Sequence, residues 1–228
     1  MKNKKIFCAL DTKNIEEALN LGKKIKKYIG GIKLGLEFFS ANGPEGIKKL
    51  SRLNLPIFLD LKFFDIKNTV IKSIESLDGL PINYLSIHIL NGKNTLKEAK
   101  QKIGELSLPF KLLGITIPTS FSEKTLEEVG INNSVNQQVE LLAKLAKETK
   151  LDGIVCSPNE IKTVKNICHD MEIFTPGIRL DEKKSDDQER IASPKFALDC
   201  GADFLVIGRP ITKGDPVENI KKIISSIN

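Results

Sequence analysis

The hydrophobic pattern of this sequence alternates regularly between two periods. Eight short runs rich in Val, Ile, Leu and Phe are separated by longer stretches in which apolar residues recur every three or four positions. The runs cover residues 5–10, 32–35, 57–62, 84–88, 111–116, 153–156, 172–175 and 203–208. Short apolar runs between amphipathic stretches are typical of β-strands that alternate with α-helices.

Several of the amphipathic stretches carry helix-start signals. Asn133 and Ser134 are candidate N-caps before one apolar stripe, and Asp215 followed by Pro216 is typical of an N-cap and a first helical residue before another. His169 falls in a stretch that we expect to be a surface helix. Three apolar stripes support helices at these places and near the N-terminus: Ile15, Ala18, Leu19, Gly22 and Ile25; Val139, Leu142, Ala143 and Ala146; Val217, Ile220, Ile224 and Ile227.

The number of repeats predicts a closed fold. Eight strand–helix units in 228 residues leave about 28 residues for each, which is the length of a βα unit. We therefore predict an α/β fold, a single-domain (β/α)8 TIM barrel over residues 1–228. An open, doubly wound sheet is the alternative, but the turn after the first run, Asp11-Thr-Lys-Asn, has no glycine-rich dinucleotide fingerprint.

Charge, hydropathy and cysteine content exclude several classes of protein. The net charge is +6, yet the lysines are scattered over expected helix faces without interleaved aromatic residues, so we expect no nucleic-acid partner. No apolar run approaches the roughly 18 residues of a membrane span, and the N-terminus has no signal-peptide core. The cysteines, Cys8, Cys156, Cys168 and Cys200, form no C-x-x-C pair. We read them as reduced thiols of a cytoplasmic protein without a membrane partner.

Charged residues stand where the first three strands end, which is where chemistry takes place in such barrels. Asp60 and Lys62 are two positions apart, so both side chains should face the barrel axis, and Asp65 follows in the loop. Asp11 and Lys33 end the first two runs and would face the same opening. Taken alone, Asp60 and Lys62 fit a structural ion pair as well as a proton donor beside a carboxylate. Because burying ion pairs often adds no stability, four such charges favour a catalytic array.

Two of the four arginines follow the last two strands, where loops of these barrels commonly bind phosphate. Arg179 ends the segment Thr175-Pro-Gly-Ile-Arg179, and Arg209 follows Gly208. The guanidinium group suits phosphate because it can donate two parallel hydrogen bonds. His88 ends the fourth run and is either a packing residue or a proton shuttle. With two histidines so far apart, we expect no His-rich metal site.

These motifs together resemble the orotidine 5′-phosphate decarboxylases. The core signature D-x-K-x-x-D occurs within Phe58-Leu-Asp60-Leu-Lys62-Phe-Phe-Asp65-Ile-Lys-Asn-Thr69. The likeness extends over nearly the full length, through Asp11, Lys33, Leu151-Asp-Gly-Ile-Val-Cys-Ser157, Thr175-Pro-Gly-Ile-Arg179, Asp187-Gln188 and Ile207-Gly-Arg209. Lys67 and Ile89-Leu-Asn-Gly92 depart from the family pattern, but at no matched catalytic position.

The resemblance implies decarboxylation of orotidine 5′-monophosphate to UMP in pyrimidine biosynthesis, by a homodimer with shared active sites and without metal or cofactor. It implies that Lys62 delivers the proton to C6 beside Asp60, with Lys33 and Asp11 completing the network. Asp65 and Thr69 would come from the partner subunit. It assigns the remaining substrate contacts to Thr119 at the pyrimidine, Gln188 between base and phosphate, and Arg179, Gly208 and Arg209 at the phosphate. The polar loop of residues 180–193 would close over the phosphate.

Related enzymes share the D-x-K-x-x-D signature and leave a second hypothesis. Sugar-phosphate decarboxylases and hexulose-phosphate synthases resemble this chain in fold but use magnesium, held partly by a Glu near the second strand end. This chain has Lys33 there, which favours the nucleotide enzyme. A basic RNA-binding protein is the non-enzymatic alternative.

Overall fold

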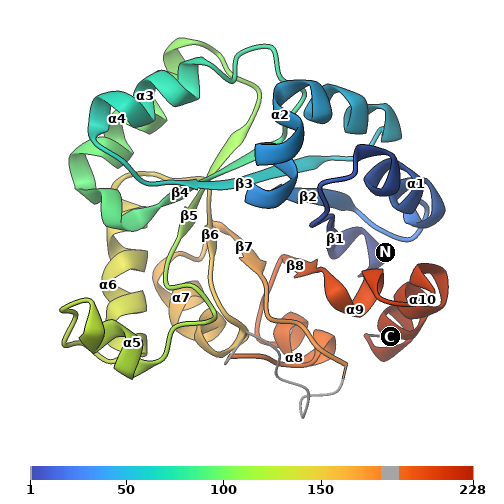
Figure 1. Ribbon diagram of the computed structural model, residues 1–228. Helices are drawn as coiled ribbons and strands as arrows, with labels where there is room; N and C mark the ends of the chain where they lie inside the picture. The colour runs from blue at the N-terminus through green and yellow to red at the C-terminus, as the bar shows by residue number, and fades with distance from the viewer. Residues whose placement is uncertain (1, 181–189, 228) are drawn as a thin grey trace.

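The computed structural model describes residues 2–180 and 190–227, and in these ranges eight parallel strands close into a barrel in chain order (Figure 1). Ile6 of the first strand pairs with Leu205 of the last, which closes the sheet. The predicted barrel is confirmed and the open-sheet alternative is wrong. The strands are β1 Ile6–Ala9, β2 Gly31–Gly35, β3 Ile57–Phe63, β4 Tyr84–His88, β5 Lys111–Ile115, β6 Gly153–Val155, β7 Glu172–Thr175 and β8 Phe204–Ile207.

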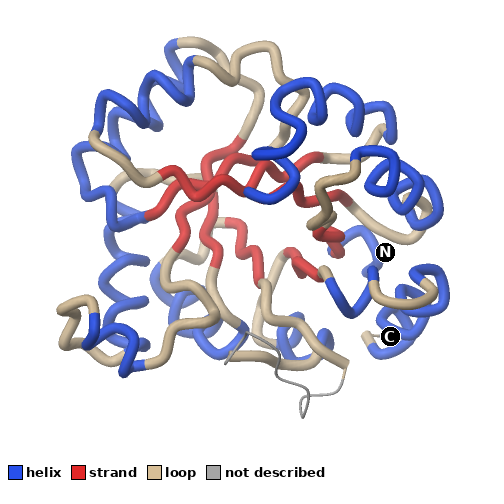
Figure 2. The backbone as a smooth tube through the Cα atoms, viewed as in Figure 1, coloured by secondary structure: helices blue, strands red, loops and turns tan. Residues whose placement is uncertain are grey.

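Helices surround the strands on the outside of the barrel (Figure 2). Helix α10 packs beside α1, so the ring of helices also closes (Figure 1). In the described ranges, no helix is both long enough and apolar enough to cross a membrane. The helices are α1 Ile15–Ile25, α2 Leu36–Leu50, α3 Lys67–Glu75, α4 Gly92–Glu105, α5 Glu123–Glu128, α6 Val135–Glu148, α7 Ile161–Ile167, α8 Pro194–Asp199, α9 Arg209–Thr212 and α10 Pro216–Ser226, with short 3-10 turns η1 Lys2–Lys5, η2 Ser51–Leu53, η3 Ile89–Asn91 and η4 Pro158–Glu160.

The helix ends follow the local signals in the sequence. Ser134 caps α6 and forms a capping box with Gln137, while Asp215 caps α10 through the backbone N–H groups of its first turn. The expectation of a helix at His169 is wrong: α7 ends at Ile167, and His169 lies in the exposed turn that follows. The helix ends there because the backbone of Cys168 leaves the helical region, with a φ of −120° and a ψ of 53°.

The hydrophobic core has two parts, one between strands and helices and one inside the barrel. The inner part is a cluster of aromatic rings, in which Phe7 lies 5.3 Å from Phe174 between ring centroids. Gly31 makes room for this cluster, because a Cβ there would come within 2.3 Å of the Phe7 ring. The rings fill the barrel toward the amino ends of the strands, and burying each one stabilises the fold by roughly 1.5–3 kcal/mol. Open space is therefore left at the carboxyl ends.

Candidate active site

A cavity of about 500 Å³ opens at the carboxyl ends of the strands, the end at which barrels of this type carry their chemistry. We call it the strand-end cavity. Its inner wall is apolar and its rim is charged. The lining residues are Ala9, Asp11, Lys33, Glu37, Phe58, Asp60, Lys62, Ile115, Ile117, Pro118, Thr119, Ser120, Val155, Cys156, Pro176, Gly177, Arg179, Val206, Gly208 and Arg209.

Strand β3 directs Asp60 and Lys62 into the strand-end cavity. Phe58, Asp60 and Lys62 alternate with residues that face the helices, so all three point inward. The pairing of β3 with β4 shifts register between Leu59 and Phe63, and Lys62 has a φ of 50°. A non-glycine residue in the left-handed region costs about 1–3 kcal/mol and persists only where its surroundings enforce it. The resulting geometry places Lys62 Nζ 2.8 Å from Asp60 Oδ2.

Ser86 on β4 helps to hold Lys62 in this backbone conformation. Its hydroxyl donates to Asp60 Oδ1 at 2.8 Å and accepts from the backbone N–H of Lys62 at 2.9 Å. Ser86 is fully buried. The sequence analysis did not single it out, although a serine between apolar neighbours in a buried strand, at an inward-facing position, is the signal that could have found it.

Lys33 extends the charge array to the first strand. Its ammonium lies 3.1 Å from Asp11 Oδ1 and 3.6 Å from Asp60 Oδ2. With the contact between Asp60 and Lys62, the four side chains form a row of alternating charges around one side of the cavity. The structure thus brings together all four residues that the sequence placed at strand ends.

The array keeps its buried members charged. Burial alone raises the pKa of Asp60, but the ammonium groups of Lys33 and Lys62 and the hydrogen bonds from Lys62 and Ser86 outweigh it, so the pKa lies below the ordinary value. Burial lowers the pKa of Lys33, and the carboxylates of Asp60 and Asp11 more than compensate, so this pKa is raised. Both shifts favour the ion pair over the neutral pair.

The other side of the cavity carries the groups that suit a phosphate and a polar ring. Arg179 follows β7 and is buried, and Arg209 is the first residue of α9 after Gly208. Both arginines and Gly208 line the strand-end cavity, as does Thr119 after β5. The two guanidinium groups therefore come from neighbouring strand ends, across the opening from the ammonium of Lys62.

Asp65 and Thr69 do not line the cavity of their own chain. Both are exposed, on the segment that leads from β3 into α3. Asn91 fixes this segment against β4: its side chain donates to Phe63 O at 2.7 Å and accepts from the N–H of Asp65 at 3.3 Å. The remaining expected contact, Gln188, and most of the 180–193 loop lie outside the described residues.

His88 has a local structural role. Its Nδ1 accepts a hydrogen bond from the N–H of Leu90 at 3.3 Å, and its ring centroid lies 5.4 Å from that of Phe64. Burial, followed by the charge of Lys62, lowers the pKa of the imidazole. His88 does not line the strand-end cavity. Of the two alternatives left by the sequence, the geometry favours packing over proton transfer.

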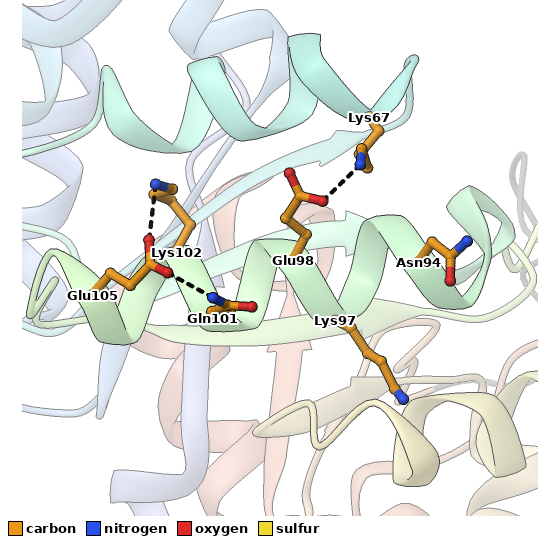
Figure 3. A pocket seen from close by; sticks show the side chains of 7 residues that line it. All are labelled: Lys67, Asn94, Lys97, Glu98, Gln101, Lys102 and Glu105. Carbon is orange, nitrogen blue, oxygen red and sulfur yellow. Dashed lines mark hydrogen bonds and ion pairs between the residues drawn. The ribbon is translucent and has the colours of Figure 1, made fainter.

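A second cavity of about 490 Å³ lies away from the strand ends, along α4 near the start of α3 (Figure 3). Its charges pair with one another: Lys67 contacts Glu98 at 2.7 Å, and Lys102 contacts Glu105 at 2.9 Å (Figure 3). Lys67 comes from α3 and the other lining residues lie along α4, so the groups are spread along the helix and do not converge on a common point (Figure 3). Of the two cavities, the strand-end cavity is therefore the candidate active site.

The fold and this cavity together define a class of protein, the (β/α)8-barrel enzymes with a charged site at the carboxyl ends of the strands. The family described as "Orotidine 5'-phosphate decarboxylase / HUMPS family" matches residues 4–223. This chain belongs to that family.

Individual relatives are similar to it over almost their whole length. A protein named orotidine 5'-phosphate decarboxylase from Wolbachia pipientis subsp. Culex pipiens (strain wPip) is 43% identical over 224 residues, which is 97% of this chain and 98% of that protein. One with the same name from Ehrlichia canis (strain Jake) is 46% identical over 225 residues, 98% of this chain and 97% of that protein. The crystal structure of orotidine 5'-phosphate decarboxylase from Lactobacillus acidophilus superposes with a TM-score of 0.80 at 37% identity, covering 98% of each chain.

Proposed function

We propose that this chain is a carboxy-lyase that converts orotidine 5′-monophosphate to UMP and CO₂ in pyrimidine biosynthesis. The observation that carries the proposal is the unbroken row of contacts from Asp11 through Lys33 and Asp60 to Lys62 in the strand-end cavity. Family membership supports the same substrate. The cytoplasm is the compartment that suits this role, because all four cysteines are unpaired.

The row of charges suits a reaction that leaves an electron pair on carbon. As the bond between C6 and the carboxyl carbon breaks, the pair stays on C6 and CO₂ leaves. The Lys62 ammonium stabilises the developing negative charge and then donates its proton to C6, becoming a neutral amine. Asp60 would lie beside the departing carboxylate, so their repulsion is relieved as CO₂ forms. Preorganised charges of this kind are the largest single source of catalysis in many enzymes.

Contacts far from C6 would supply the energy to hold the substrate in this position. Arg179, Gly208 and Arg209 would bind the phosphate, and Thr119 and Gln188 would contact the pyrimidine, Gln188 also bridging toward the phosphate. A guanidinium pairs with phosphate through two parallel hydrogen bonds, which fixes orientation as well as distance. Binding energy gained at the phosphate can then be used at the reacting carbon.

Lys33 is the residue that favours the proposed reaction over those of the magnesium-dependent relatives with the same barrel. Its ammonium stands between Asp11 and Asp60, at 3.1 Å and 3.6 Å from their carboxylate oxygens. A positive charge is therefore already provided by the chain where those relatives have a carboxylate for the metal. This arrangement disfavours the alternative of a magnesium-dependent sugar-phosphate decarboxylase or hexulose-phosphate synthase.

We also propose that the active unit is a homodimer in which Asp65 and Thr69 reach the partner's strand-end cavity. Two observations support this arrangement: neither residue lines its own cavity, and the apolar neighbours Phe64 and Ile66 are 62% and 73% exposed. A second copy of the chain would bury this apolar segment. The carboxylate of Asp65 would then join the partner's row of charges next to Lys62.

A spectrophotometric assay tests the reaction. Purified protein is mixed with orotidine 5′-monophosphate in the presence of a chelator, and the loss of orotate absorbance is followed. We expect turnover by wild type and by Lys48→Ala, a change at an exposed lysine paired with Glu45. Lys62→Ala should lose nearly all turnover while still binding UMP. Turnover that disappears with chelator, or that survives in a folded Lys62→Ala variant, would contradict the proposal.

A further inference from the structure

We propose that Glu160 and Arg190 form a buried positioning pair, which sets the separation between the part of the strand-end cavity that holds the base and the part that holds the phosphate. The proposal rests on the proposed nucleotide substrate. Arg190 Nη1 contacts Glu160 Oε1, and their side chains are 12% and 1% exposed. Neither residue lines the cavity. Because a buried ion pair often adds no stability over apolar packing, its position behind the site requires another explanation.

Arg190 fixes the loop that follows β5. Its Nη2 donates to the carbonyl oxygens of Ile117 and Pro118, at 3.0 Å and 2.7 Å, and its backbone N–H donates to Thr119 O at 3.3 Å. These three consecutive residues line the strand-end cavity. One residue from the far end of the chain thus determines where Thr119, the proposed pyrimidine contact, is held.

Glu160 fixes the loop that follows β6. Its carboxylate accepts from the N–H of Ser157 at 2.9 Å and from the Ser157 hydroxyl at 2.7 Å, which forms a capping box at the start of η4. Cys156, which lines the cavity, immediately precedes this turn. The same carboxylate oxygen that accepts from Ser157 Oγ contacts Arg190, so the loops after β5 and β6 are joined through one ion pair.

The segment that begins at Arg190 also fixes the loop that follows β7. The N–H of Ala192 donates to Gly177 O at 3.0 Å, and the N–H of Arg179 donates to Ala192 O at 2.9 Å. Gly177 has a φ of 79°, and a Cβ at this residue would come within 2.6 Å of Arg190 O, so only glycine fits there. Arg179, the proposed phosphate contact, is thereby held at a set distance from Thr119.

The geometry of the guanidinium group explains why arginine serves here. Its donors lie in a fixed plane and it stays charged, so it can contact a carboxylate and two carbonyl groups at once. A lysine would keep the charge but present a single nitrogen. We therefore expect Arg190→Lys to preserve the fold and to loosen the loop after β5, and Glu160→Gln to weaken the ion pair while leaving a hydrogen-bonding group.

The test compares a complete nucleotide with its two parts. Binding of UMP, uridine and inorganic phosphate is measured for wild type, Arg190→Lys, Arg190→Met and Glu160→Gln, with circular dichroism to verify folding. Because the pair sets a distance between two subsites, affinity for UMP should fall by about tenfold to a hundredfold while affinity for each part changes little. For orotidine 5′-monophosphate, KM should rise and kcat should fall, and both changes should be smaller in Arg190→Lys than in Arg190→Met.

A matched ion pair at the opposite end of the barrel provides the control. Lys100 on α4 contacts Asp152, which precedes β6, and both are partly buried. Lys100→Met should change UMP affinity by less than about twofold. Unchanged UMP affinity in folded Arg190→Lys and Glu160→Gln would overturn the proposal, as would equal losses for uridine and UMP. If wild type neither bound UMP nor consumed orotidine 5′-monophosphate, the proposed function itself would have failed instead.

Discussion

Ser86 Oγ donates a hydrogen bond of 2.8 Å to Asp60 Oδ1. The same oxygen accepts from the backbone N–H of Lys62, the residue whose φ is 50°. One buried side chain on β4 therefore orients the carboxylate and supports the strained residue that follows it on β3. The relative placement of Asp60 and Lys62 depends on a residue that belongs to neither their strand nor the cavity lining.

Ser86→Ala tests this dependence. The change leaves an oxygen of Asp60 and the N–H of Lys62 without their partner, which should lower the free energy of unfolding by about 1–3 kcal/mol. The misplaced ammonium should also lower kcat about tenfold or more. Ser51→Ala, which removes an exposed hydrogen bond to Lys48 O, is the matched control. A Ser86→Ala enzyme with reduced stability and normal kcat would show that Ser86 serves the fold alone.

Arg209→Ala tests the assignment of the phosphate end of the cavity. Loss of a charged hydrogen-bond donor should lower kcat/KM for orotidine 5′-monophosphate by a factor equivalent to about 1.5–3 kcal/mol of transition-state stabilisation. It should hardly change turnover of the phosphate-free nucleoside. Arg52→Ala controls for loss of positive charge, since Arg52 is exposed and lies outside the strand-end cavity. Equal losses on both substrates would point to a role at the base or to misfolding.

Mixing two inactive variants tests the shared site. If Asp65 serves the partner's Lys62, a heterodimer of Lys62→Ala and Asp65→Ala chains holds one doubly altered site and one intact site. Random pairing makes about half of the dimers mixed, so activity should recover to roughly a quarter of wild type. Subunit exchange is followed independently with differently tagged chains. Verified exchange without recovery would place the action of Asp65 within its own chain.

The ionisation of Asp60 gives a pH-dependent test. Its pKa is lowered from the ordinary value of 3.8 because the surrounding ammonium groups outweigh burial. A lowered pKa contributes stability that is present above the ordinary value and is lost only as pH falls through the folded-state pKa. The difference in thermal midpoint between wild type and Asp60→Asn should therefore stay constant from about pH 8 to about pH 5 and shrink below about pH 4.

The control for the pH test is Asp199→Asn, because Asp199 is exposed and pairs with Lys195 on the same helix. Its stability difference from wild type should be small at every pH. If the Asp60→Asn difference instead shrank as pH rose from about 5 to about 7, burial would dominate and the pKa of Asp60 would be raised.

The sequence alone determined the architecture and the chemical groups at the strand ends. Every predicted strand agrees with the structure to within one residue at each end, and the caps at Ser134 and Asp215 are where the sequence indicated. These features depend on a few adjacent residues, because hydrophobic period and capping are local properties of the chain. The alternation of inward and outward side chains then placed Asp60 and Lys62 on the same side of β3.

Only the tertiary structure decided how those groups are held. The left-handed backbone at Lys62, its support by Ser86 on β4, and the contact between Glu160 and Arg190 join residues that are well separated in the chain. The exposure of Asp65 likewise follows from the path of the segment between β3 and α3, which Asn91 sets from the next strand end. Such contacts depend on the register and closure of the barrel, which bring distant strand ends to a single opening. No local pattern in the sequence encodes the distances between side chains from different strands.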